Sequence, residues 1–158
     1  MNRVKSVILL TLLSVILMAI GGAFGGRSGA FTMLLVSFGI NFITYWNCDK
    51  IALAQYDAKY VSPQDVPELY DLVKKLCQNA KIPMPKLYVI PTDVPNAFAT
   101  GRNVNHAAVA ITEGLLSRLN KDELAGVISH ELSHIRHHDT LIMTLAASIA
   151  SAIGYIAQ

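Results

Sequence analysis

The sequence contains only two cysteines, Cys48 and Cys77, among its 158 residues. Two cysteines are too few for a disulfide framework, and reduced thiols are typical of a cytoplasmic domain. Charge is also scarce, since 15% of the residues are charged while 53% are hydrophobic. This composition is too apolar for a simple soluble domain. No segment is repeated or of low complexity, so nothing indicates a repeat or fibrous protein.

Two stretches lack charged residues altogether, from Ser6 to Gly26 and from Ser28 to Cys48. Each is about 21 residues long, which is enough to cross a bilayer as a helix. We therefore expect residues 1–54 to form a transmembrane hairpin, with spans at about 6–26 and 28–48. A cleavable signal peptide is the alternative for the first stretch, but the apolar run is longer than a usual signal core and a second span follows at once.

The first 48 residues contain no acidic side chain, and their basic residues flank the two expected spans. Arg3 and Lys5 precede the first span and Lys50 and Lys59 follow the second, whereas Arg27 stands alone in the turn. Because cytoplasmic segments are enriched in Lys and Arg, both ends of the hairpin are expected to face the cytoplasm. The net charge of +2 is therefore attributed to membrane flanks, and we expect the lipid bilayer, and no nucleic acid, as a partner.

A soluble composition begins near Ser62, so residues 55–139 are expected to form the N-terminal part of a cytoplasmic domain. Hydrophobic residues from Leu69 to Cys77 recur at helical spacing, which predicts an amphipathic helix capped by Ser62 or Asp65. Residues 49–61 are expected to be a helical continuation of the second span or a connector that leads out of the membrane.

Two short strands are predicted next, at residues 86–90 and 107–111, with a turn at Gly101-Arg102-Asn103. They are expected to form a small antiparallel sheet beside the helices, followed by a short helix at residues 112–119. The fold class predicted from these elements is α+β and mostly helical. A third uncharged run, residues 140–158, is expected to be a hydrophobic helix, either as a third transmembrane span or buried in the soluble domain.

The motif His130-Glu131-Leu132-Ser133-His134 carries most of the functional interpretation. On a helix, residues four apart lie on one face, so His130 and His134 can present ring nitrogens to a single Zn²⁺ ion. Glu131 lies one residue along and can reach a water at the open position of the metal, where it would act as general base. This is the pattern of a metalloprotease helix.

The surrounding residues favour a helix at this motif. Asn120 followed by Glu123 is typical of a capping box, and Leu124, Val127, Ile128, Leu132 and Ile135 recur at helical spacing. Chance placement of three polar residues on an exposed helix is the alternative.

A catalytic zinc site usually has three protein ligands, and the motif supplies two. His137 and His138 lie too far along a continuing helix, and Asp139 would face the opposite side of it. His106 and Glu113 would reach the site only through tertiary folding. The third ligand is therefore expected beyond residue 158, which makes this chain the N-terminal half of a longer enzyme.

With these residues in view, the sequence resembles the HtpX group of membrane-bound zinc metalloproteases, which are related to the CAAX prenyl endopeptidases. The resemblance covers the whole chain and includes the stretch Asn96-Ala97-Phe98-Ala99-Thr100-Gly101, which is more discriminating than the His-Glu motif. It implies a zincin-like domain with His130 and His134 as zinc ligands, Glu131 as general base and a glutamate from a later helix as third ligand.

The resemblance also implies a function and a location. The implied activity is endoproteolysis of misfolded or damaged membrane proteins, in quality control and stress response, at the cytoplasmic face of the bacterial inner membrane. By physical analogy, the strand with Asn96, Ala97 and Phe98 is expected to pair its backbone with an extended substrate. Asp139 is hypothesised to support the site by accepting a hydrogen bond from a ligand histidine.

Two other interpretations stay open from the sequence. An intramembrane protease would carry the motif inside a span, but charged residues on both sides of the motif disfavour burial in lipid. A membrane protein without catalytic activity, either truncated or lacking the metal, would retain the fold alone, and the zinc stoichiometry of the purified chain distinguishes it from an enzyme.

Overall fold

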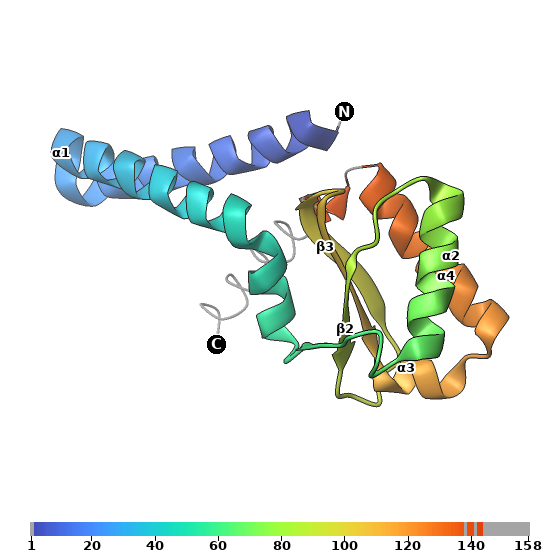
Figure 1. Ribbon diagram of the computed structural model, residues 1–158. Helices are drawn as coiled ribbons and strands as arrows, with labels where there is room; N and C mark the ends of the chain where they lie inside the picture. The colour runs from blue at the N-terminus through green and yellow to red at the C-terminus, as the bar shows by residue number, and fades with distance from the viewer. Residues whose placement is uncertain (1, 138, 141, 144–158) are drawn as a thin grey trace.

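The computed structural model describes residues 2–137, 139–140 and 142–143 (Figure 1). Within these ranges the chain is mostly helical and carries one small sheet. The hydrophobic helix expected at residues 140–158 lies almost wholly outside the described residues.

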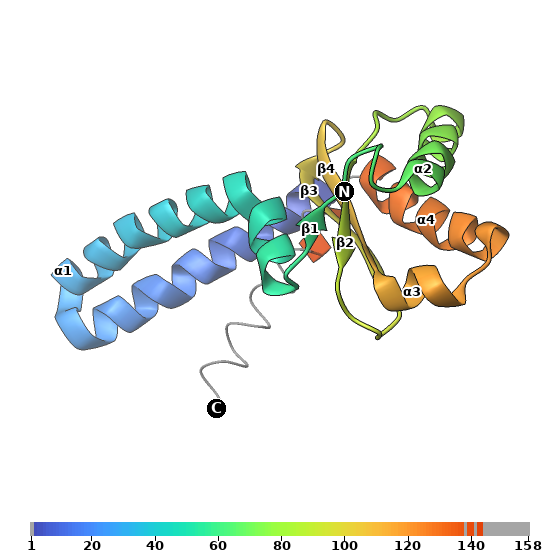
Figure 2. The same cartoon turned by 60° about the horizontal axis from the view of Figure 1, so that its bottom comes forward.

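Helix α1, Asn2–Gln55, is the longest element, and its chain direction reverses at Gly26 (Figures 1 and 2). Gly26 has φ 58° and ψ −146°, a backbone conformation that glycine adopts without the steric cost of a side chain. The residues on either side of Gly26 form two helical arms that lie next to each other. A second break at Asn47, with φ −117° and ψ 19°, separates the arm from a last short helical segment.

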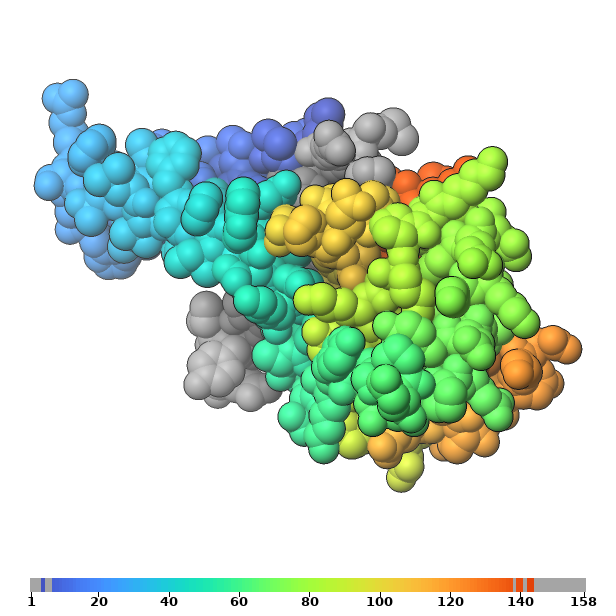
Figure 3. Space-filling view, in the orientation of Figure 1, coloured from blue at the N-terminus to red at the C-terminus, as the bar shows by residue number. Residues whose placement is uncertain are grey.

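The two arms of α1 are joined by a polar contact in an otherwise apolar interface. The amide nitrogen of Asn41 donates a hydrogen bond to the Leu10 carbonyl at 3.2 Å and another to Ser14 Oγ at 2.9 Å. Large hydrophobic side chains cover the outside of both arms and are exposed, Phe24 by 92% of its surface. Figure 3 shows the tip of the arms standing clear of the rest of the molecule. Residues 7–55 are long and apolar enough to cross a membrane by length and composition.

The sheet has four strands in the order β1-β2-β4-β3, comprising β1 Lys59–Tyr60, β2 Lys86–Ile90, β3 Ala97–Asn103 and β4 His106–Thr112. Strands β1 and β2 pair antiparallel, as do β3 and β4, but β2 and β4 pair parallel. The prediction of an antiparallel sheet was therefore wrong. Because β3 forms a full strand between β2 and β4 in sequence, the chain reverses direction twice, which brings β4 beside β2 in the same direction.

The predicted turn at Gly101-Arg102-Asn103 was also misplaced, since these residues belong to β3. Gly101 has φ 132° and sits where the register of β3 against β4 shifts. A Cβ there would lie 2.1 Å from the His106 carbonyl oxygen, so glycine permits the close approach of the two strands. The turn itself is formed by Val104 and Asn105.

Helix α2, Pro67–Ala80, buries the predicted face through Leu69, Val73 and Cys77. Its predicted cap was wrong: the Asp65 carboxylate instead accepts hydrogen bonds from the backbone nitrogen and hydroxyl of Ser62, at 2.8 and 2.6 Å. The helix begins with Pro67, whose fixed φ suits a first helical position.

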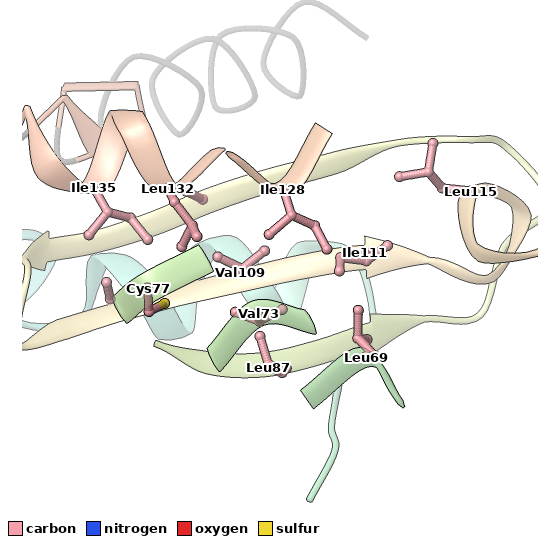
Figure 4. Close-up of a cluster of buried hydrophobic side chains, with 12 residues drawn as sticks. Leu69, Val73, Cys77, Leu87, Val109, Ile111, Leu115, Ile128, Leu132 and Ile135 are labelled. Carbon is pink, nitrogen blue, oxygen red and sulfur yellow. The ribbon is translucent and has the colours of Figure 1, made fainter. Parts of the chain in front are cut away.

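Helices α3, Glu113–Arg118, and α4, Lys121–Arg136, complete the described fold. Helices α2 and α4 pack together on one face of the sheet, and their buried side chains meet those of β2 and β4 (Figure 4). This core contains the residues Leu69, Val73, Cys77, Leu87, Val109, Ile111, Leu115, Ile128, Leu132 and Ile135.

The other face of the sheet is covered by the last segment of α1. Leu53 packs there with Ile90, Ala108 and Ala110 in a separate buried cluster. Odd-numbered residues of β4 from Ala107 to Ile111 belong to the first core and even-numbered ones to this cluster, because side chains alternate along a strand. The apolar N-terminal element and the sheet are therefore joined by packed side chains.

Candidate active site

Helix α4 presents the His-Glu motif beside the sheet, and its start is fixed by the predicted capping box. Asn120 Oδ1 accepts hydrogen bonds from the Asp122 and Glu123 backbone nitrogens, each at 3.0 Å, and the Glu123 carboxylate accepts one from the Asn120 nitrogen at 2.9 Å. The predicted apolar stripe is confirmed, since Ile128, Leu132 and Ile135 are at most 2% exposed. These contacts set the rotation of the helix, so its opposite face carries the histidines.

His130 and His134 point their Nε2 atoms at each other, 3.3 Å apart, with the ring planes at 87°. Two ligands bound to Zn²⁺ at 2.0–2.1 Å in a tetrahedron are separated by about 3.3–3.4 Å. The spacing of the two nitrogens therefore matches one edge of a tetrahedral zinc site. Because His130 is exposed and His134 half-buried, the pair remains open toward solvent.

Glu131 is turned away from that open side and toward the edge strand of the sheet. Its side chain is 9% exposed, and Oε2 accepts a hydrogen bond from the Ala99 backbone nitrogen at 3.0 Å. This contact ties the motif helix to β3 across 32 residues of sequence. It also places the carboxylate of the residue that follows His130 at the outer edge of the sheet.

Asp139 lies beside His134, with Oδ2 at 3.6 Å from the ring Nδ1. Helix α4 ends at Arg136, and the Asp139 nitrogen donates to the His134 carbonyl at 3.0 Å, so the regular helix is interrupted before Asp139. The expectation that Asp139 faces away from the motif assumed a longer helix and was wrong. Nδ1 is the nitrogen left over when Nε2 binds a metal, so this placement suits the hypothesised supporting role.

The stretch that carries the family resemblance forms the start of β3. Ala97 opens the strand, and the backbone of Asn96 exchanges hydrogen bonds with Thr112. Phe98 packs against Tyr56 with ring centroids 5.1 Å apart, on the α1 side of the sheet. The Phe98 ring therefore lies on the opposite side of the sheet from the motif helix, whereas the side chains of Ala97 and Ala99 pack on the side of that helix.

The described residues contain no group of three or more His, Cys, Asp or Glu side chains that could hold a metal ion. His106 instead contacts Asn103 Oδ1 through Nδ1 at 2.9 Å, and Glu113 is exposed in the first turn of α3. His138 lies outside the described residues. The described residues therefore bring two imidazoles together, and none of the described candidates joins them as a third ligand.

Two contacts near the site were missed from the sequence. Thr140 is buried and its hydroxyl donates to the Gly101 carbonyl at 2.8 Å, which ties the chain after α4 to β3. Arg102 reaches the arm of α1 at Trp46, donating to its carbonyl at 3.2 Å. Neither contact has a sequence signature, because each joins a side chain to a distant backbone carbonyl.

Comparison with known proteins agrees with this geometry. The sequence profile of peptidase family M48 matches residues 63–158. Three curated proteins named "Protease HtpX homolog" match nearly the whole chain. The protein from Desulfatibacillum aliphaticivorans is 51% identical, and the match covers 99% of this chain and 51% of the relative. The proteins from Thermodesulfovibrio yellowstonii and Pelotomaculum thermopropionicum are 49% and 50% identical, and each match covers 100% of this chain and 56% of the relative.

The chain therefore belongs to peptidase family M48, and the predicted relationship to the HtpX group is confirmed. It spans about half the length of these curated relatives. A crystal structure of Ste24p from S. mikatae shares the fold, with a TM-score of 0.57 over 94% of this chain and 37% of that chain, at 16% identity.

Proposed function

We propose that this chain is the N-terminal part of a membrane-bound zinc endopeptidase that hydrolyses peptide bonds of misfolded or damaged membrane proteins. Membership of a protease family supports hydrolysis of peptide bonds. The observation that carries the zinc assignment is the 3.3 Å separation of His130 and His134 Nε2, which suits two ligands of one tetrahedral ion.

His130 and His134 would hold one Zn²⁺ ion per chain, and Asp139 would orient His134 through Nδ1. The ion would lower the pKa of a bound water and polarise the scissile carbonyl. Glu131 would take the proton from that water and pass it to the leaving amine, as a general base and then a general acid. Its contact with Ala99 holds the carboxylate at the sheet edge, where a substrate backbone would lie.

Strand β3 is the proposed substrate platform because it is the outermost strand of the sheet on the side of α4. An extended peptide that adds to an edge strand gains main-chain hydrogen bonds without demanding a particular sequence. This property suits an enzyme acting on many unfolded polypeptides. Asn96 and Ala97, at the start of β3, and the backbone of Phe98 are the proposed contacts.

The two arms of α1 are proposed to cross the bilayer as a hairpin, with both ends and the catalytic domain on the cytoplasmic side of the bacterial inner membrane. The first arm, residues 2–25, is about 36 Å long and the second, residues 27–46, is about 30 Å long, so each can cross a hydrocarbon core of about 30 Å. The exposed apolar side chains along both arms and the flanking Lys and Arg residues support this placement.

The third zinc ligand is proposed to come from outside the described residues, because these offer no group of three ligands. The relatives extend to about twice the length of this chain, so a longer version is the proper test object.

The test is casein cleavage by a chain extended with the downstream coding sequence, beside the same chain carrying Glu131→Gln. The proposal expects cleavage that requires Zn²⁺ and is lost in Glu131→Gln while the bound zinc stays. An extended chain that neither binds zinc nor cleaves casein would instead favour a membrane protein without catalytic activity.

A further inference from the structure

The chain that follows the motif helix is held against the edge strand of the sheet. Thr140 is 2% exposed, and its hydroxyl donates a hydrogen bond to the Gly101 carbonyl at 2.8 Å. Losing this partner would cost free energy, because water does not replace a hydrogen bond at a buried position. Thr140 is therefore fixed to β3, and Figure 1 shows this end of the described chain, in red, beside the strand.

The acceptor of this hydrogen bond lies at an irregularity of the strand. The register of β3 against β4 shifts between Gly101 and Asn103, and Gly101 has φ 132°, a conformation that favours glycine. Irregularities of this kind are frequent next to active sites, where they redirect the chain. The direction of the Gly101 carbonyl is thus set by the local backbone of β3.

The outer edge of β3 holds two parts of the candidate site at once. The Ala99 nitrogen donates to Glu131 at 3.0 Å, and two residues later the Gly101 carbonyl accepts from Thr140. Residues two apart in a strand direct their backbone groups to the same side and are separated by about 7 Å. The strand therefore fixes the proposed general base and the segment after α4 relative to each other.

Asp139 lies directly before Thr140 and connects this anchor to the histidine pair. Its nitrogen donates to the His134 carbonyl at 3.0 Å, and its own carbonyl accepts from the Met143 nitrogen at 3.1 Å. Its Oδ2 lies 3.6 Å from His134 Nδ1, and both side chains are only partly exposed. Because 3.6 Å is longer than a hydrogen bond, this contact alone does not hold the carboxylate, and its position depends on how the backbone is anchored.

We propose that Thr140 is a positioning residue of the zinc site: by binding Gly101 it holds Asp139 where the carboxylate orients His134 toward the metal. The inference rests on the proposed zinc site and adds a residue to its support. A ligand histidine donates its second ring N–H to such an acceptor, and loss of the acceptor typically weakens metal binding about 10- to 100-fold. The Thr140 hydroxyl acts one step further from the metal, so its loss is expected to weaken zinc binding about tenfold.

The test compares Thr140→Val, which keeps the shape of the side chain but removes the hydroxyl, with Thr140→Ser, which keeps the hydroxyl. Both are made in the chain extended with the downstream coding sequence, and zinc affinity is measured by competition with a chromogenic chelator. Thr140→Val should bind zinc about tenfold more weakly, whereas Thr140→Ser should stay within about twofold of the unmodified chain. Equal zinc affinity of the unmodified chain and Thr140→Val would overturn the inference.

Two further measurements show whether Thr140 acts through Asp139. In a chain that already carries Asp139→Asn, Thr140→Val should change the zinc affinity by less than about twofold, because the acceptor that it positions is gone. A full additional loss in that background would show an effect on the fold alone and overturn the inference. In NMR spectra of the zinc-loaded chain, the His134 Nδ1 proton should be observed in the unmodified chain and in Thr140→Ser, and lost in Thr140→Val.

Thr112→Val is the matched control, because Thr112 is also 2% exposed and its hydroxyl also bonds backbone atoms, those of Asn96 and Leu115. It should destabilise the fold but leave the zinc affinity and the His134 signal unchanged.

Where Thr140→Val fails to fold, Thr140→Ala beside Thr140→Ser isolates the hydroxyl in the same way, since both lack the methyl group. An extended chain that holds no zinc would contradict the zinc proposal itself. Zinc binding that does not depend on the Thr140 hydroxyl would overturn this inference alone.

Discussion

Replacing Glu131 separates the chemistry of its carboxylate from its contact with the sheet. In the structure Oε2 accepts a hydrogen bond from the Ala99 nitrogen at 3.0 Å in a buried position. The amide oxygen of glutamine can occupy the same place and accept from the same N–H group. Glu131→Gln should therefore retain a neutral hydrogen bond of about 0.5–1.5 kcal/mol, whereas Glu131→Ala should lose the charge-assisted one, which contributes about 1.5–3 kcal/mol.

Hydrogen exchange of the Ala99 amide measures this difference directly. A loss of about 1.5–3 kcal/mol corresponds to exchange about 10 to 150 times faster in Glu131→Ala, and Glu131→Gln should change the rate by less than about tenfold. Exchange in α2 should be the same in all three chains. In the extended chain, both variants should lose casein cleavage by a factor of about 10²–10⁴, the usual contribution of a general base.

Two results would refute this reasoning. Equal exchange of the Ala99 amide in the unmodified chain and in Glu131→Ala would show that the carboxylate does not hold β3. Casein cleavage retained in Glu131→Gln would show that Glu131 is not the base.

Three further predictions concern the capping box, a buried thiol and the residue beside His134. Asn120→Ala removes both acceptor contacts of the cap and should lower the free energy of unfolding by about 1 kcal/mol and the Tm by about 2–4 °C, measured by circular dichroism beside Asn105→Ala. Burial raises the pKa of Cys77 to about 11, so iodoacetamide should alkylate the folded chain slowly at pH 8 and about tenfold faster per pH unit above it, whereas rapid reaction at pH 8 would contradict a buried thiol. Asp139→Asn should weaken zinc binding by the extended chain about 10- to 100-fold. An unchanged zinc affinity and turnover would show that Asp139 does not orient His134.

The raised pKa of Cys77 also makes the free energy of unfolding depend on pH. Because the folded chain holds the thiol proton up to a pKa of about 11, above the ordinary value of 9.0, the unfolded chain releases this proton first as pH rises. Cys77 therefore opposes folding increasingly between about pH 9 and 11, and its contribution is absent below pH 9.

The motif helix was predictable because its signals are local. The cap at Asn120, the apolar stripe from Leu124 to Ile135 and the four-residue spacing of the histidines all depend on helical periodicity, which a sequence displays directly. The buried strand at residues 107–111 was also found, since its uninterrupted apolar run needs no partner to be recognised.

The pairing of the sheet was not predictable in the same way. Strand direction depends on how many strands lie between two partners, and β3 contains a glycine and an arginine that suggested a turn. Asp139 was misplaced because the end of α4 is set by tertiary contacts, including the bond from Thr140 to Gly101, which no local pattern indicates. The bond between Glu131 and Ala99 involves a backbone donor and has no residue preference to reveal it.

The zinc content of the extended chain tests the central claim most directly, measured by mass spectrometry beside His130→Asn and His134→Asn. If the two facing imidazoles form one edge of a zinc site, the unmodified chain should hold one zinc per chain, and either substitution should reduce this to a small fraction. Retention of one zinc per chain in both variants would place the metal elsewhere and contradict the assignment of the site.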